Sequence, residues 1–443
     1  MIQKRLAVRI EAALQSPALA IVAAFVLRIS LLWWIHRDRD AHLFLFFPSS
    51  HETWSVANAL AGGKGFASPL AGMQGPTAWV APLYPSMIAL ALKVFRMDNY
   101  AAVVVCLTLN CIAAALTCWP VYEIGKKIGN HQIGLASCWV WAFLPGSVIF
   151  TLEWLWDPSF SAFFMALLIY WTLDLPEATS PLAWARYGLL WAVAVLMNPA
   201  VGVLFPFLLL WLVQRRQQSQ LPWFSKLSLV VIVFMSCLAP WTVRNYVAFG
   251  KLVPIKDNFG LEFWLGNNPA VKRDWSPDKH PVGVPQEMQR LIRLGETDYM
   301  SAKQQEAIEF IESHPAVFLR SSFDRVVDTW TGLNDVPSDR WVHTLHAGTA
   351  YIWSTTAFSL LAFAGLFLAV RTGGFASAPI WIAPIIFPMT YYITHSQLRY
   401  RHPIDPVMTV LAVYALAHIR SRVFTNRVSH DASEPVPLVE IQQ

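Results

Sequence analysis

Apolar segments of about 20 residues recur along the 443-residue chain, separated by short polar stretches. A helix of roughly 20 apolar residues crosses the ~30 Å hydrocarbon core of a bilayer, so each segment predicts a membrane span. The pattern therefore predicts an all-α polytopic membrane protein with about ten transmembrane helices. The predicted spans are residues 17–36, 101–122, 131–150, 158–175, 184–198, 199–213, 226–243, 349–370, 376–395 and 404–420.

Two apolar stretches do not fit a simple alternation of spans and loops. Residues 79–95 are apolar enough to cross the membrane, but counting them as a span would move the basic loop at Lys126 to the outer face. We therefore interpret 79–95 as a membrane-surface or re-entrant segment. Within 184–213, Asn198-Pro199 interrupts the apolar run. Because proline disfavours a continuous helix, we predict a hairpin of two spans there.

Basic residues cluster in the loops on one side of the predicted spans. Loops rich in Lys and Arg remain in the cytoplasm, and with a cytoplasmic N-terminus every cluster falls on that side. The loop at 151–157, on the opposite side, contains no Lys or Arg. We therefore predict that both termini are cytoplasmic. The clusters are Lys4, Arg5 and Arg9; Lys126 and Lys127; Arg215 and Arg216; Arg371; and Arg420, Arg422 and Arg427.

The predicted topology divides the chain into four parts. An N-terminal membrane module, residues 1–243, includes a first outer loop at about 37–100. A mostly helical outer domain is predicted at 244–348, where apolar residues recur at helical spacing. The last membrane helices occupy 349–420, and the polar tail 421–443 is predicted to be disordered and cytoplasmic.

Composition agrees with this class and excludes several functions. Only 14% of the residues are charged and 55% are apolar, whereas soluble globular chains carry about 25% charged residues. Loop lysines and arginines explain the net charge of +5, so no nucleic-acid partner is predicted. All five cysteines lie in apolar segments, which argues against a disulfide framework or a zinc site. The absence of a Walker A motif argues against an ATP-driven pump.

Acidic residues stand at the ends of apolar segments on the predicted outer face. Glu52 fits a capping box with Ser49, and Asp157-Pro158 fits an N-cap followed by proline. The functional alternative makes Glu52 a general base in a crevice at the membrane surface and turns Asp157 toward the same site. Glu153, one turn before Asp157, is a further candidate.

Basic residues on the same face predict a phosphate site. Arg399 and Arg401 follow the ninth predicted span and break the charge pattern, and a guanidinium binds phosphate oxygens in a bidentate manner. Arg244 is a third candidate. Anchoring at the membrane interface is the structural alternative for all three. His280, in the outer domain, is a candidate metal ligand, with a solvated loop histidine as its alternative.

Short motifs in a fixed order run along most of the chain. After the first-loop acid they are Ala57-x-x-Leu60-x-x-Gly63-x-Gly65-Phe66, Gly75-Pro76-Thr77-Ala78-Trp79, Pro82-Leu83-Tyr84-Pro85, Asp157-Pro158, Pro240-Trp241-x-x-Arg244-Asn245-Tyr246 and Arg399-Tyr400-Arg401-x-Pro403. This order resembles bacterial membrane glycosyltransferases of the GT-C superfamily, related to protein O-mannosyltransferases and aminoarabinose transferases. The resemblance extends from about Ile21 to Ala417. Relatives often carry paired acids in the first loop, whereas here His51 precedes Glu52.

The resemblance implies a fold and a substrate class. It implies membrane helices with interfacial helices in the first outer loop, around a cavity open to the outer leaflet of the bacterial inner membrane. It also implies a donor sugar carried on a polyprenyl phosphate. The acceptor is a hydroxyl on a glycan, a lipid or a protein. Membrane lipids surround such an enzyme.

Roles for the candidate residues follow from that reaction. Glu52 is expected to take the acceptor proton in an inverting transfer, and Asp157 to position a substrate or help hold a metal. Arg399, Arg401, Arg244 or a divalent cation, with His280 as a candidate ligand, is expected to stabilise the phosphate. The predicted sugar or acceptor pocket consists of His51, Trp79, Tyr84 and Glu153.

Two other functions are compatible with the same segments. A transporter or flippase for a lipid-linked sugar would grip phosphate with the same arginines and would need no carboxylate base. Transporters usually show two related halves with interrupted helices at matching positions, and only Asn198-Pro199 is an obvious break here. A non-catalytic scaffold would tolerate alanine at Glu52 and Asp157.

Overall fold

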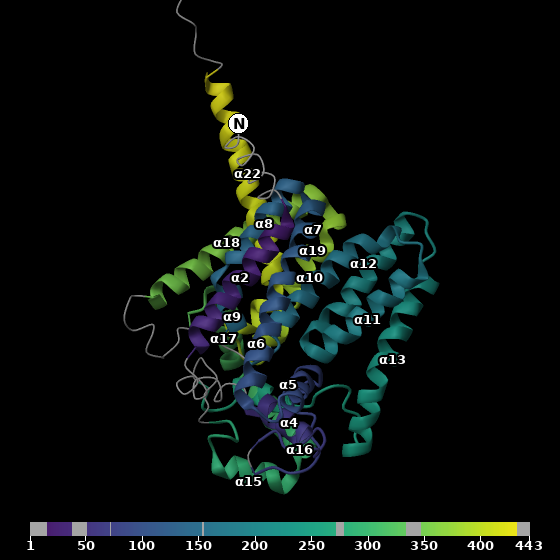
Figure 1. Cartoon of the computed structure of the whole chain (residues 1–443), viewed down its shortest axis with the longest axis vertical. Helices are drawn as coiled ribbons and strands as arrows, with labels where there is room; N and C mark the ends of the chain where they lie inside the picture. The colour runs from purple at the N-terminus through teal and green to yellow at the C-terminus, as the bar shows by residue number, and fades with distance from the viewer. Residues whose placement is uncertain are drawn as a thin grey trace, which may run out of the picture.

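The structure is a computed structural model that describes residues 16–37, 51–70, 72–152, 155–271, 279–333 and 347–431. In this part of the chain the regular secondary structure is helical, apart from one isolated antiparallel bridge between Ala67 and Pro76. Figure 1 shows the arrangement of the helices. The α-helices are α2 (Pro17–His36), α4 (His51–Ala61), α5 (Leu83–Val94), α6 (Asn99–Leu116), α7 (Cys118–Ile128), α8 (His131–Phe143), α9 (Pro145–Leu152), α10 (Pro158–Asp174), α11 (Pro181–Met197), α12 (Phe205–Gln218), α13 (Phe224–Phe249), α14 (Phe259–Gly266), α15 (Pro285–Leu294), α16 (Glu296–Ser313), α17 (Pro315–Thr331), α18 (Ala347–Gly373), α19 (Ala378–Ile386), α20 (Met389–Ile393), α21 (Leu398–Arg401) and α22 (Asp405–Asp431); short 3₁₀ turns are η1 (Leu175–Glu177), η2 (Pro199–Leu204), η4 (Gly374–Ser377) and η5 (His402–Ile404).

Long apolar helices confirm the predicted polytopic membrane class. Six helical segments of the described chain are long and apolar enough to cross a membrane, or seven if the bent pair α8–α9 counts as one span. Each of the ten predicted spans overlaps helical structure, but the predicted spans 349–370 and 376–395 fall in one apolar run, Tyr351–Ile393. Helix α5, inside the ambiguous segment 79–95, has 12 residues and is shorter than a span.

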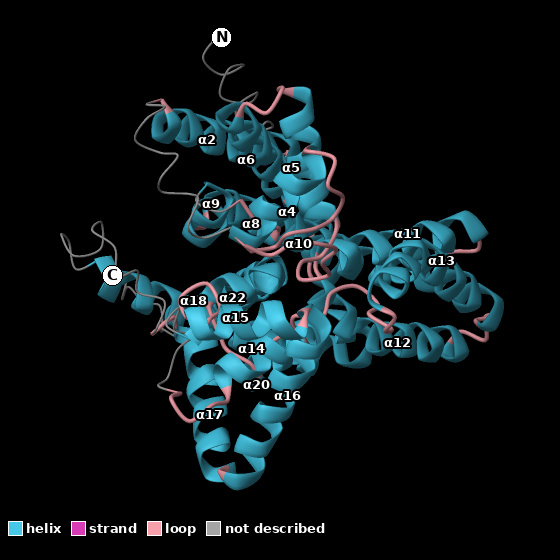
Figure 2. Cartoon of the chain, turned by 90° about the horizontal axis from the view of Figure 1, so that it is seen from below, coloured by secondary structure: helices cyan, strands magenta, loops and turns pink. Residues whose placement is uncertain are grey.

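The break at Asn198-Pro199 lies where the sequence predicts it. Helix α11 ends at Met197, η2 begins at Pro199, and the Asn198 side chain accepts the amide of Ala200 at 3.1 Å. The hairpin of α11 and α12 packs with α13 into a layer of helices beside the main bundle (Figures 1 and 2). The close packing of α11 on α13 depends on Gly188, where a Cβ atom would lie 2.6 Å from the Val230 carbonyl oxygen.

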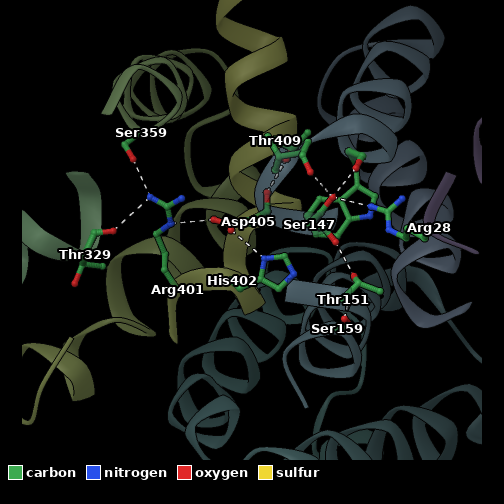
Figure 3. Close-up of polar contacts among 12 residues, drawn as sticks. Arg28, Ser147, Thr151, Ser159, Thr329, Ser359, Arg401, His402, Asp405 and Thr409 are labelled. Atoms are coloured by element: carbon green, nitrogen blue, oxygen red, sulfur yellow. Dashed lines mark hydrogen bonds and ion pairs between the residues drawn. The ribbon is translucent and has the colours of Figure 1, made fainter. Parts of the chain in front are cut away.

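Helix α2 carries a fully buried arginine in the middle of the bundle. The Arg28 guanidinium donates to the carbonyl oxygens of Ala24 at 3.0 Å and Ala142 at 2.9 Å, and to Ser147 Oγ at 2.7 Å (Figure 3). Two of these acceptors belong to α8 and to α9. The charge thus joins the first predicted span to the bent pair α8–α9.

Basic residues gather at one end of the membrane helices. Lys127 pairs with Asp174 at 2.8 Å, Arg216 donates to the Pro176 carbonyl at 2.9 Å, and Lys226 donates to the Thr179 carbonyl at 2.6 Å. Figure 1 shows α4, α5, α15 and α16 at the opposite end. This grouping agrees with the predicted sidedness, while the assignment of the basic end to the cytoplasm stays a prediction.

Helices α14, α15, α16 and α17 occupy the predicted outer region. A small apolar cluster joins this region to the first outer loop, and it includes Trp79 of the loop. The domain boundaries stay predictions, and α22 continues to Asp431, beyond the predicted start of the tail at residue 421. The rest of the cluster is Leu70, Leu261, Leu265, Leu291, Tyr299 and Met300.

Candidate active site

Glu52 lies in the first turn of α4, and its carboxylate faces His280 of the outer region. Glu52 Oε1 is 3.8 Å from His280 Nε2, and 20% of the Glu52 side chain is exposed. The Val282 amide donates to His280 Nδ1 at 3.3 Å, so a neutral imidazole carries its proton on Nε2, toward Glu52. Burial lowers the pKa of His280, against the charges of Glu52 and Glu262, which raise it. Neutral His280 therefore presents an N–H to a carboxylate that solvent still reaches.

A second acid–histidine pair lies close to the first. His395 Nε2 is 2.6 Å from Glu262 Oε2, and this pair joins α14 to the turn after α20. Burial raises the pKa of Glu262, but the hydrogen bond and charge of His395, with the charges of Lys256 and His280, lower the pKa to about 2. Glu262 is therefore a carboxylate at neutral pH. Neither Glu262 nor His395 is among the site residues predicted from the sequence.

The approach of α14 to this turn depends on Gly266. A Cβ atom on Gly266 would lie 1.7 Å from the Thr394 carbonyl oxygen, so only glycine fits. Asn267 Nδ2 donates to the Ile393 carbonyl at 2.8 Å, and Arg325 donates to the carbonyls of Gly266 and Ile393. These contacts hold the backbone on both sides of the Glu262–His395 pair.

Asp157 stands before α10, yet its side chain does not cap that helix. Its Oδ2 accepts Ser161 Oγ at 2.5 Å and Asn198 Nδ2 at 3.0 Å. Burial raises the pKa of Asp157, while the Ser161 bond, the charge of Lys256 and the Asn198 bond oppose that change. The carboxylate thus ties α10 to the break between α11 and η2 and lies within the field of Lys256.

Arg399 packs against the loop that carries Asp157. Its guanidinium carbon is 4.3 Å from the ring centre of Trp156, the residue before Asp157, and Nη2 donates to Tyr400 Oη at 3.1 Å. The Tyr400 ring contacts His395 at 5.3 Å between centroids. Arg399 and Tyr400 therefore connect the loop that carries Asp157 to the Glu262–His395 pair, and the charge of Glu262 in turn acts on His280, the partner of Glu52.

Lys256 is a cationic member of the site that the sequence analysis missed. Its charge acts on Asp157, which belongs to a distant segment, and on Asp257 and Glu262, which follow Lys256 in the chain. The backbone before Lys256 is fixed, because Trp241 Nε1 donates to the Ile255 carbonyl at 2.8 Å. The available signal was weak: a lysine at the start of the outer region, shortly after the Pro240-Trp241 motif.

Arg244 and Arg401 make protein contacts in this structure. Arg244 donates to the carbonyls of Thr77 at 2.7 Å and Phe66 at 2.5 Å, which clamps the first outer loop. Arg401 is buried; its Nε donates to Asp405 Oδ1 at 2.9 Å and its Nη1 to Ser359 Oγ at 2.9 Å (Figure 3). Their predicted phosphate contacts stay predictions, and the geometry gives both arginines a structural role.

The predicted pocket residues fall in different surroundings. Trp79 is buried and meets the His280 ring edge-on at 5.9 Å, so it lies behind the Glu52–His280 pair. Tyr84 is buried, donates to Asn110 at 3.2 Å and is close enough to Asp157 to feel its charge. Glu153 lies outside the described residues, as does Ser49, the predicted capping partner of Glu52. The backbone of His51 begins α4, and its side chain is outside the described part.

The candidate site offers few ligands for the predicted divalent metal ion. Glu52 and His280 supply one oxygen and one nitrogen, but the Nε2 proton of His280 points at the carboxylate. Within the described ranges, no group of three His, Cys, Asp or Glu side chains could hold a metal ion. The described side chains do not complete a metal site, and the divalent metal stays a prediction.

Comparison with known proteins gives a fold. No protein-family model matches the chain, and no curated protein matches its sequence. The apo oligosaccharyltransferase of Archaeoglobus fulgidus matches with a TM-score of 0.52 and 15% identity, over 94% of this chain and 51% of that one. The chain therefore shares the fold of this oligosaccharyltransferase. It spans about half the length of the oligosaccharyltransferases that it matches.

Further solved structures are similar to this chain. The archaeal oligosaccharyltransferase AglB from the same organism, in complex with an inhibitory peptide and a dolichol-phosphate, has a TM-score of 0.51 and 14% identity, over 95% of this chain and 52% of that one. ArnT from Cupriavidus metallidurans, bound to undecaprenyl phosphate, has a TM-score of 0.40 and 12% identity, over 94% of this chain and 81% of that one.

Proposed function

We propose that this protein is a membrane glycosyltransferase that moves a sugar from a polyprenyl-phosphate donor to an acceptor hydroxyl on the outer face of the bacterial inner membrane. The observation that carries the proposal is the partly exposed Glu52–His280 pair, which is electrostatically coupled to the Glu262–His395 pair, and the contact of Arg399 with the loop of Asp157. The GT-C fold supports it, since a structural neighbour, AglB, is an oligosaccharyltransferase whose structure holds a dolichol-phosphate.

Glu52 is the proposed general base. Its carboxylate takes the proton of the acceptor hydroxyl while that oxygen attacks the anomeric carbon, and the bond from that carbon to the phosphate oxygen breaks with inversion. Polyprenyl phosphate leaves with the bonding electron pair. A positioned base contributes about 10²–10⁴-fold. Neutral His280, with its Nε2–H toward Glu52, orients the carboxylate and leaves it free to accept a proton.

The leaving phosphate needs positive charge rather than a proton donor. Arg399 and Lys256 are the proposed partners, because Arg399 packs on the loop of Asp157 and the charge of Lys256 acts on both Asp157 and Glu262. Preorganised cations that face the developing charge stabilise a transition state without reorganisation. This assignment keeps Arg399 from the sequence analysis and adds Lys256 to it.

Asp157 is the proposed orienting group. Ser161 and Asn198 fix its carboxylate on one oxygen, so the group has a set direction. A fixed carboxylate oxygen can accept hydrogen bonds from hydroxyl groups of the sugar or of the acceptor. Correct orientation lowers the entropic part of the barrier.

The test is radiolabelled sugar transfer from polyprenyl-phosphate donors, measured in membranes that carry the wild type, Glu52→Gln or Glu312→Gln. Glu312 is an exposed acid of α16 and serves as the matched control. We expect transfer by the wild type and the control, and a loss of about 10²–10⁴-fold in Glu52→Gln. Near-normal turnover in Glu52→Gln would exclude Glu52 as the base. Donor binding without transfer in all three would favour the transporter.

A further inference from the structure

Two carboxyl groups meet where the outer region touches the first outer loop. Glu296, the first residue of α16, is 6% exposed; its Oε2 lies 2.5 Å from Thr77 Oγ1, and its Oε1 accepts the Ala78 amide at 2.6 Å. Asp257 donates its own amide to the Ala78 carbonyl at 3.0 Å. The carboxyl groups of Asp257 and Glu296 lie close enough for each to shift the pKa of the other.

The surroundings of the two carboxyl groups favour a proton on one of them. Both Asp257 oxygens are buried and have no hydrogen-bond partner among the described residues, so a second negative charge beside Glu296 is poorly stabilised. Burial, followed by the charge of Asp257, raises the pKa of Glu296 to about 8. Burial also raises the pKa of Asp257, against the charges of Lys251 and Lys256. Two carboxyls this close hold one shared proton at neutral pH.

The pair is connected to Glu52 through a short chain of contacts. Thr77 Oγ1, which meets Glu296, accepts the Trp79 amide at 3.0 Å. The Trp79 ring packs edge-on against His280, and His280 Nε2 faces Glu52 at 3.8 Å. Movement of residues 77–79 would therefore move the support of the proposed base.

We propose that Glu296 is a positioning residue whose shared proton with Asp257 holds residues 77–79 and thereby sets the place of Glu52. The proposal rests on the proposed function, in which Glu52 is the base. The charged groups that face the pair are Arg244, which clamps the same loop from the Thr77 carbonyl, and the two lysines near Asp257.

The direction of the pH effect follows from the proton count. A carboxyl group whose pKa is raised in the closed loop holds a proton that it gives up when the loop is released. Closure is therefore most favoured at acidic pH, weakens as pH rises above the ordinary range of a glutamate, and reaches its minimum above about pH 8. Glutamine at position 296 accepts from Ala78 and donates to Asp257 at every pH, and should remove this dependence.

The first readout is the pH profile of kcat/KM for sugar transfer between about pH 6 and 9.5, in wild type, Glu296→Gln, Glu296→Ala and the exposed control Glu312→Gln. We expect wild type and control to lose up to roughly 100-fold at alkaline pH, the cost of about 1 Å of misplacement. Glu296→Gln should keep its activity there, and Glu296→Ala should be low throughout. A decline in Glu296→Gln that matches the wild type would overturn the proposal.

The second readout is hydrogen exchange in a peptide that covers residues 66–79, corrected for intrinsic rates, in the same proteins. We expect protection to fall with rising pH in wild type and to stay constant in Glu296→Gln. This measurement needs no sugar donor, so it separates the two ideas. Constant protection in Glu296→Gln with an active Glu52→Gln would overturn the base and keep the clamp. Equal exchange in wild type and Glu296→Gln would overturn the clamp.

Discussion

Replacing Gly266 with alanine should separate Glu262 from His395. The added Cβ would start 1.7 Å from the Thr394 carbonyl oxygen, and real Cβ contacts essentially never fall below 3.0 Å, so the backbones must part by about 1.3 Å. If α14 moves as a unit, the 2.6 Å contact between Glu262 and His395 opens to about 3.9 Å. That distance is beyond the range of a hydrogen bond.

Two costs are expected from this displacement. Overpacking of a close contact costs about 1–3 kcal/mol of stability, and the lost charge-assisted hydrogen bond adds roughly 1.5–3 kcal/mol. A site displaced by about 1 Å loses on the order of 10²-fold in rate. Thermal unfolding in detergent, followed by Trp fluorescence, measures the first effect. The transfer assay measures the second.

Gly146→Ala is the matched control, because its Cβ would meet the nearest atom, Phe150 Cε2, at 3.8 Å, an ordinary van der Waals contact. We expect this variant to unfold and react as the wild type does. A Gly266→Ala protein with wild-type melting temperature and turnover would refute the reasoning from this close approach.

Three other substitutions test the charged residues of the site and its surroundings. Arg399→Ala should raise the donor KM about tenfold, equivalent to about 1.4 kcal/mol, at unchanged melting temperature. Arg401→Ala should lower the melting temperature, because removing the partner of a buried charge such as Asp405 costs about 3–5 kcal/mol of stability. Donor titrations and thermal scans distinguish the two. Because the pKa of Glu262 is lowered to about 2, the stability from its pair with His395 is complete above about pH 4.5 and is lost as pH falls toward 2. Unfolding temperatures between about pH 6 and 3 should therefore fall less steeply in Glu262→Gln, and equal slopes would contradict this.

The sequence predicted the helices better than the site. Apolar length and basic loops were enough for the polytopic class, and proline chemistry located the break at Asn198. Both signals come from residues that are close together in sequence, so a single sequence is enough to detect them. The position of Glu52 at the start of a short helix was equally local, but its partner His280 lies more than 200 residues away in sequence.

The missing site residues depend on contacts that periodicity does not encode. Glu262 and His395 come together because Gly266 allows α14 to touch the turn after α20. Arg401 was predicted to bind phosphate because a charge at that position costs free energy unless it has a partner. In the structure the partner is Asp405, one helical turn later, which neutralises the Arg401 charge inside the protein. An i to i+4 pair of this kind is visible in sequence and would have indicated the structural role.

The buried Arg28 has a consequence for how the protein enters the membrane. A lone arginine at the centre of a span costs roughly 2.5–3.5 kcal/mol during insertion, and two of its three acceptors, on α8 and α9, are synthesised more than 100 residues later. Until α8 and α9 are synthesised, we therefore expect α2 to stay beside the insertion machinery or to keep water at the Arg28 guanidinium. Its release into lipid then depends on the arrival of the bent helix pair, which makes assembly of this bundle a sequential event rather than an independent insertion of each span.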